Sequence, residues 1–174
     1  MTYNLLTVAA VGPETMAGAL AEIVREQRPD TPVADAFVAS VDKVRQAASA
    51  LARLSLDDDV SSPIWSAKDN LVVWERVIRQ MESGWAPSGW YPVGLYRERL
   101  EARDELAALG ARLPSEVAEL LGEALEQLDS RFAAVTEEDP SGSLRRELMG
   151  GSADQTPVGW WWHRRPHPTP WEQD

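Results

Sequence analysis

The sequence predicts an all-α protein, an up-down antiparallel helical bundle with four main helices and a short N-terminal helix, followed by an irregular C-terminal tail rich in tryptophan and proline. Three observations predict this fold. Apolar residues recur at steps of three and four in separate segments, which is the spacing of one helix face. Proline or glycine interrupts the pattern between these segments. Because the connections are short, consecutive helices are expected to run antiparallel and to bury their apolar faces together.

The first part of the chain is expected to hold two helices, at residues 13–28 and 33–56. The first stops before Pro29, because proline cannot continue a helix. The second follows Asp30-Thr31-Pro32, in which a capping residue precedes a proline at the first helical position. Its apolar stripe consists of Phe37, Val41, Val44, Ala48 and Leu51. For the apolar run at residues 3–11, periodicity does not decide between a strand and an extended arm.

Further helices are expected at residues 66–84, 95–110, 115–135 and, as a short element, 143–149. The segment Ser66-Ala67-Lys68-Asp69 offers a cap with an acidic residue in the first turn. A loop rich in glycine and proline follows at residues 84–94, since that composition does not continue a helix. The clearest amphipathic helix comes after Pro114, with an apolar face made of Val117, Leu121, Ala124, Leu128, Phe132 and Val135.

Length and composition fit a single domain without covalent support. A chain of 174 residues can bury a core without disulfides, and the absence of cysteine excludes disulfides, thiolate nucleophiles and zinc ribbons. The bundle is expected to occupy residues 1–151 and the tail residues 152–174. No signal-peptide pattern opens the chain and no apolar run reaches ~18 residues. A cytoplasmic protein without a membrane partner is therefore expected.

The charge argues against a nucleic-acid partner. A formal net charge of −11 would repel a phosphate backbone, and the basic residues are scattered rather than clustered. Lysine occurs only at Lys43 and Lys68, whereas arginine and alanine are abundant. That bias is typical of GC-rich genomes and indicates an actinobacterial source. An exposed apolar stripe on the bundle would favour a homodimer.

No complete catalytic set is found in the sequence, and no cofactor is predicted. His163 and His167 lie four residues apart and are the candidate ligands of a divalent metal, but Pro166 and Pro168 interrupt the helix that this spacing needs. Four glutamates recur at helical steps opposite the apolar face of the last long helix, which indicates a solvated surface rather than a carboxylate-bridged metal pair. They are Glu116, Glu119, Glu123 and Glu126.

The tail carries the strongest peculiarity. Three consecutive indoles at residues 160–162 point in different directions on any backbone, so at least one is exposed, covered by a partner or folded back over the bundle. Alternating prolines favour an extended polyproline II path that partners can recognise. Two hypotheses follow, a docking peptide or a clasp packed on its own bundle. The candidate binding residues are Trp85, Trp90, Tyr91, Trp160, Trp161, Trp162 and Trp171.

A segment at residues 65–74, Trp-Ser-Ala-Lys-Asp-Asn-Leu-Val-Val-Trp, resembles DinB-like proteins, in which a Trp-Ser-x-Lys-Asp/Glu segment opens the second bundle helix. The resemblance covers roughly residues 34–135 and implies a four-helix bundle, often with a divalent metal held by three histidines. Members include mycothiol-dependent isomerases and transferases, such as maleylpyruvate-isomerase-like enzymes. The family's first histidine position is Val73 here, and its later His-x-x-x-His pair has the spacing of His163 and His167, so the metal triad is degenerate.

Together these patterns favour a non-catalytic helical binding or interaction protein that uses an aromatic groove and the tail to contact a protein partner or a small-molecule ligand. One alternative is a DinB-like metal- or thiol-dependent enzyme with His163, His167 and a carboxylate such as Asp69 or Glu75. The other is a binder of a small anionic ligand. Its candidate arginines, which neighbouring glutamates are expected to pair, are Arg76, Arg79, Arg97 and Arg99.

Overall fold

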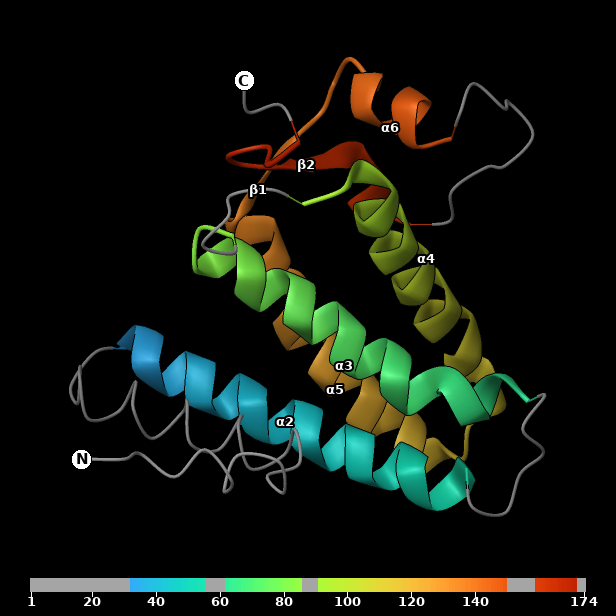
Figure 1. The fold of residues 1–174 in the computed structure, drawn as a ribbon. Helices are drawn as coiled ribbons and strands as arrows, with labels where there is room; N and C mark the ends of the chain where they lie inside the picture. The colour runs from blue at the N-terminus through green and yellow to red at the C-terminus, as the bar shows by residue number, and fades with distance from the viewer. Residues whose placement is uncertain (1–31, 56–61, 86–90, 150–158, 172–174) are drawn as a thin grey trace, which may run out of the picture.

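A computed structural model of the protein describes residues 32–55, 62–85, 91–149 and 159–171. Its main elements are four long helices, and successive helices run in opposite directions (Figure 1). They are α2 (Pro32–Ser55), α3 (Pro63–Glu82), α4 (Val93–Leu109) and α5 (Ser115–Ala134). The predicted all-α bundle is therefore confirmed. The apolar run at residues 3–11, the helix expected at residues 13–28 and Trp90 lie outside the described residues.

The helices pack in the spatial order α4, α3, α2 and α5. Helix α3 contacts both α4 and α2, and α2 contacts α5 along its length. Buried apolar side chains of all four helices form one core, with Trp74, Tyr96 and Phe132 as its largest fully buried members. No helix in the described ranges combines the length and the apolar character needed to cross a membrane.

Helix α3 begins one turn earlier than the sequence pattern predicts. Ser62 is the N-cap, and its hydroxyl accepts a hydrogen bond from the backbone N–H of Ile64 at 3.3 Å. Pro63 fills the first helical position, where its fixed φ is suited to the helix and no N–H is needed. Ser66 consequently lies inside the first turn, where its hydroxyl donates to the carbonyl oxygen of Pro63.

The end of α3 has an unusual backbone. Gly84 adopts a φ of 75°, as residues after helix C-termini often do. Trp85 also adopts a positive φ, 69°, in the left-handed region that a bulky side chain rarely enters. Such a conformation costs on the order of 1–3 kcal/mol unless its surroundings impose it. Its backbone N–H donates to the carbonyl of Gln80 at 2.7 Å, and its side chain contacts Tyr91 and the C-terminal tail, as described below.

A two-stranded antiparallel sheet joins the end of the bundle to the tail, and the sequence analysis did not predict it. Strand β1 (Thr136–Glu138) pairs with strand β2 (Arg164–Pro166), with Thr136 opposite Pro166. The backbone N–H of Asp139 extends the pairing by donating to the carbonyl of His163 at 2.8 Å. A strand of three residues is too short to show the alternation of apolar and polar residues from which strands are predicted.

Three short elements complete the described chain. A 3₁₀ turn, η2 (Gly110–Arg112), follows α4, and a second one, η3 (Trp160–His163), contains the three consecutive tryptophans. The short helix α6 (Ser143–Leu148) matches the element expected at residues 143–149. In Figure 1, α6 and the tail strand β2 lie at the end of the bundle where α4 begins and α5 ends.

Candidate functional site

One carboxylate holds two of the three consecutive tryptophans against the bundle. Asp104 lies on α4, and its Oδ1 accepts a hydrogen bond from the Trp161 indole nitrogen at 2.9 Å. Its Oδ2 accepts one from the Trp162 indole nitrogen at 2.7 Å. An indole N–H can only donate, so burying it requires an acceptor. Asp104 supplies that acceptor for both rings, which are 5% and 3% exposed.

Arg103, the residue before Asp104, connects the tail to a second carboxylate. Its Nε and Nη2 donate to the two oxygens of Asp129 on α5, at 3.0 and 2.7 Å. The guanidinium carbon lies 4.2 Å from the centre of the Trp161 ring, which is a cation–π geometry. Trp74 of α3 donates its indole N–H to the same Asp129 at 3.3 Å. One polar network thus links α3, α4, α5 and the tail.

The outer part of the tail is held through its backbone oxygens. The Tyr96 hydroxyl donates to the carbonyl of Arg164 at 3.2 Å, and the Trp85 indole nitrogen donates to the carbonyl of Pro168 at 2.9 Å. Burial raises the pKa of the Tyr96 phenol, so the hydroxyl stays protonated and remains a donor. Trp171 packs on Tyr96 with the ring centres 5.3 Å apart.

Arg164 fixes the tail to the end of α5. Its Nε donates to the hydroxyl of Thr136 at 2.7 Å, and its Nη2 donates to the carbonyls of Thr136 and Ala133 at 2.6 and 3.0 Å. These acceptors are neutral, so the bonds position the guanidinium without cancelling its charge.

Two aspartates near the tail have pKa values that shift in opposite directions. Burial raises the pKa of Asp104 and outweighs the indole hydrogen bonds from Trp162 and Trp161, which lower it. Burial also acts to raise the pKa of Asp139, but hydrogen bonds from Ser141 and from the backbone N–H of Leu144 contribute to a net lowering. Asp139 thus accepts a backbone hydrogen bond at the start of α6, whereas burial disfavours the charged form of Asp104.

The structure places the predicted binding residues mainly in the interior. Trp85, Tyr91, Trp161 and Trp162 are buried, and Trp171 is partly buried. Trp85 and Tyr91 pack against each other with ring centres 4.9 Å apart and ring planes tilted by 44°. In the described part of the chain these aromatic side chains therefore fill the protein rather than line an open groove. The tail from residue 159 to 171 has the packed arrangement of the clasp hypothesis.

Trp160 differs from its two neighbours because 44% of its surface is exposed. Its ring lies 5.9 Å from that of Phe132, which is fully buried, and 6.1 Å from that of Trp161 in an edge-to-face arrangement. The guanidinium carbon of Arg164 lies 5.7 Å from the ring centre. An exposed indole is thus fixed in place by three side chains that are themselves anchored.

The predicted metal ligands do not come together with further ligands in the described ranges. Both histidines are exposed, and they flank strand β2 in sequence, His163 directly before it and His167 directly after it. Within those ranges no three side chains of histidine, aspartate or glutamate form a set that could hold a metal ion. Of the two suggested carboxylates, Glu75 is buried and paired with Arg79, whereas Asp69 is exposed beside Lys68. The metal site at the two histidines stays a prediction.

The expected surface glutamates and ion pairs are observed. Glu116, Glu119, Glu123 and Glu126 are all exposed, which confirms the predicted solvated face of α5. Arg79 pairs with Glu75, and Arg97 pairs with Glu101 at 2.8 Å. Two of the four arginines suggested for an anionic ligand are therefore occupied by neighbouring carboxylates.

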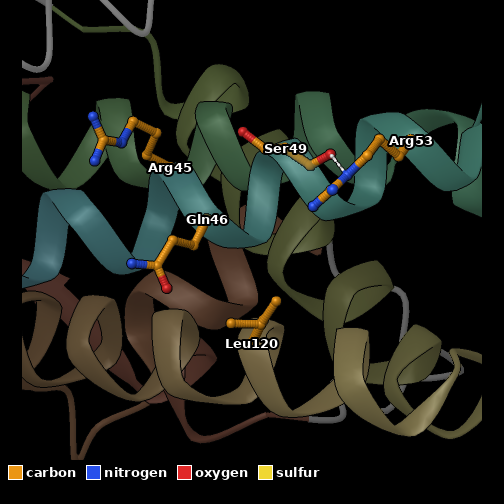
Figure 2. Close-up of a pocket in the computed structure, with 5 residues that line it drawn as sticks. All are labelled: Arg45, Gln46, Ser49, Arg53 and Leu120. Carbon is orange, nitrogen blue, oxygen red and sulfur yellow. Dashed lines mark hydrogen bonds between the residues drawn. The ribbon is translucent and has the colours of Figure 1, made fainter.

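A groove of about 290 Å³ lies between α2 and α5, and no pattern in the sequence marks its residues as a site. Its lining comprises Arg45, Gln46, Ser49 and Arg53 of α2 and Leu120 of α5. Figure 2 shows Gln46 reaching from α2 toward the side of Leu120, while Arg53 lies back along α2 toward Ser49. Arg45 lines the groove at the other end of this stretch of α2, and its side chain extends away from Leu120.

Sequence reasoning also missed Arg103, Asp104 and Asp129, the polar residues that hold the tail. One signal was available, because Arg103 lies three residues after Leu100 and three before Leu106. That spacing puts a charge on the apolar face of the helix, where it needs a buried partner. No comparable pattern marks Asp104 as the acceptor for two indoles from the tail.

Comparison with known proteins gave no match to any family model, curated protein or solved structure.

Proposed function

We propose that this protein is a non-catalytic helical interaction protein, and that Trp160 is the centre of its contact surface for a protein partner. The single observation that supports this is the exposure of one tryptophan whose ring packs on side chains that are themselves held by the bundle and the tail. Trp160 is 44% exposed although the next two tryptophans are buried. Its position is set by Phe132, Trp161 and Arg164.

A fixed aromatic side chain is an efficient anchor for a partner. Tryptophan and arginine dominate the energetic centres of protein interfaces, because a large ring buries much area and a guanidinium offers several donors. Ordering a side chain on binding costs ~0.5–1.5 kcal/mol, and a side chain that is already ordered avoids that cost. Trp160 and Arg164 lie in contact, so they form a preorganised pair of this kind.

The packed tail, residues 159–171, positions Trp160 through the contacts of its neighbouring residues. Hydrogen bonds from Trp161 and Trp162 to Asp104 fix the turn on which Trp160 lies. Strand β2 then fixes the residues that follow, including Arg164. In this proposal the buried tail residues support the surface, and Trp160 makes the contact.

The test compares two exposed tryptophans. Trp65 on α3 is 46% exposed, which makes Trp65→Ala a matched control for Trp160→Ala. Tagged wild-type protein and both variants are used to capture partners from a lysate of the source cells, and the affinity of the purified partner is then measured by calorimetry. We expect Trp160→Ala to weaken binding by about tenfold or more and Trp65→Ala to leave it unchanged.

Circular dichroism and thermal unfolding of both variants show whether the fold is retained. If the partner binds the folded Trp160→Ala variant as tightly as it binds the wild type, the proposal is wrong. Sedimentation of the protein alone covers the case in which the partner is a second copy of the chain, since Trp160→Ala would then shift the monomer–dimer equilibrium.

A further inference from the structure

The groove between α2 and α5 presents basic side chains in a chain whose net charge is −11. Arg45, Ser49 and Arg53 follow one another at steps of four residues on α2. That spacing brings them to one face of the helix, about 6 Å apart along its axis. Gln46 flanks the row, and Leu120 of α5 provides an apolar side chain on the facing wall.

The charge of Arg53 is not neutralised by a carboxylate in the described part of the chain. Its Nε donates to the backbone carbonyl of Ser49 at 3.3 Å, which is a neutral acceptor. This bond holds the side chain along the groove, as Figure 2 shows, and leaves the two terminal nitrogens of the guanidinium for another acceptor. A guanidinium held in this way has the planar pair of donors that an oxyanion needs.

Arg45 is paired only weakly. It contacts Asp42 at 3.0 Å, and both side chains are more than half exposed, at 55% and 51%. Exposed ion pairs contribute little free energy, so this arginine can turn to another anion at small cost. On α5, Glu123 lies about one turn beyond Leu120 and already pairs with Lys43.

We propose that this groove binds a small phosphomonoester. Arg53 would hold the phosphate oxygens, and the Gln46 amide and the Ser49 hydroxyl offer further hydrogen bonds. Arg45 lies about 12 Å from Arg53 along the helix axis and would add positive charge at the other end of the groove. Leu120 would contact the organic part. A volume of about 290 Å³ is near the lower limit for small-molecule sites, which suits a ligand of a few heavy atoms beyond the phosphate.

The site is distinct from the Trp160 surface. Trp160 packs on Phe132 near the end of α5, and Leu120 lies twelve residues earlier on the same helix. Twelve residues of helix span about 18 Å. Substitutions in the groove are therefore expected to leave partner binding through Trp160 unchanged. The failure of one proposal would not count against the other.

The experiment is a titration of the ¹⁵N-labelled full chain with glycerol 3-phosphate, followed by two-dimensional NMR at constant ionic strength. Inorganic phosphate and glycerol are titrated in parallel, which separates the contribution of the phosphate from that of the organic part. We expect saturable shifts confined to residues 45–53 and the region around Leu120, with glycerol 3-phosphate binding more tightly than inorganic phosphate and glycerol alone giving none.

Three variants test the role of Arg53. Arg53→Ala is expected to weaken binding by about tenfold, the effect of losing a charge-assisted hydrogen bond. Arg53→Lys keeps the charge but not the planar fork and is expected to lie between Arg53→Ala and the wild type. Arg76→Ala removes an exposed arginine of α3 outside the groove and should bind as the wild type does.

The proposal is overturned if no saturable shifts occur, if they lie outside the groove, or if Arg76→Ala weakens binding as much as Arg53→Ala does. The last result would show a general effect of net charge rather than a site. Because Arg53 and Arg76 are exposed, their variants are expected to fold, and the spectrum of each free variant verifies this directly.

Discussion

The two sides of the bundle are closed by different kinds of contact. On the side of α2 and α5, helix packs directly on helix, and apolar side chains such as Leu51 and Leu121 belong to stripes whose steps of three and four are visible in the sequence. On the side of α4, the tail inserts Trp161 and Trp162 and is fixed by hydrogen bonds to Asp104. A segment without helical periodicity can therefore still be part of the core, when polar groups distant in sequence accept the hydrogen bonds of its indole N–H groups.

The largest expected effect separates adjacent tryptophans. Trp162→Ala should lower the free energy of unfolding by about 3–5 kcal/mol, because it leaves a cavity in the core. Trp160→Ala removes a half-exposed ring and should cost less than about 1.5 kcal/mol. Urea denaturation followed by circular dichroism measures both values. Equal losses for the two variants would show that the tail is not divided into a buried part and an exposed part.

Asp104 provides the next test, since it accepts both buried indoles. Asp104→Ala leaves these donors without their acceptor and should cost about 1–3 kcal/mol. Asp104→Asn keeps one carbonyl oxygen and should cost less. Asp69→Ala, at an exposed carboxylate of α3, is the control and should change stability by no more than about 0.5 kcal/mol. A result in which Asp104→Ala resembles the control would remove the polar anchor from the account of the tail.

Alanine substitutions at two glycines are expected to have opposite effects on stability in the tail and in helix α5. A methyl group added at Gly159 would overlap the indole of Trp161, so Gly159→Ala should destabilise the protein by about 1–3 kcal/mol. Gly122 lies inside α5 with open space around it, so Gly122→Ala should stabilise the helix by about 0.5–1 kcal/mol. Thermal unfolding of the two variants should therefore shift in opposite directions. A shift in the same direction for both would contradict the close packing at Gly159.

The smallest expected effect is a difference in pH dependence. The lowered pKa of Asp139 contributes stability above its ordinary value of 3.8, and this contribution is lost as the pH falls through the folded-state pKa. The raised pKa of Asp104 has the opposite sign, since stability falls as the pH rises from 3.8 through the raised value. Urea denaturation between pH 3 and 7 should show each slope weakened in the corresponding asparagine variant. Identical pH profiles for wild type and both variants would refute these assignments.

The helices could be predicted from the sequence because their signals are local. The apolar stripe of α5 and the stop at Gly84 lie within a few residues of what they determine, and the structure confirms them. Helix α3 begins earlier than expected because Ser62 and Pro63 form a better cap and first turn than Ser66 does.

The arrangement of the tail could not be predicted, because its determinants are distant in sequence. The prolines favour an extended path, and the tail is extended in strand β2, where it pairs with β1, but the tryptophans before it form the 3₁₀ turn η3 beside Asp104. Asp104 precedes Trp161 by 57 positions, and no spacing rule connects them. The sequence did require that one of three adjacent indoles be exposed or covered, and Trp160 is the exposed one. The residues of the α2–α5 groove are ordinary surface residues in sequence, and only the facing helix identifies them as a site.

The most direct measurement is hydrogen exchange at the indole nitrogens of ¹⁵N-tryptophan-labelled protein, with the signals assigned through single Trp→Phe variants. We expect the indole protons of Trp161 and Trp162 to exchange slowly, because both are buried and bonded to Asp104, and that of Trp160 to exchange at nearly the rate of a free indole. Rapid exchange at all three positions would contradict the central claim that the tail is part of the core and presents Trp160 on its surface.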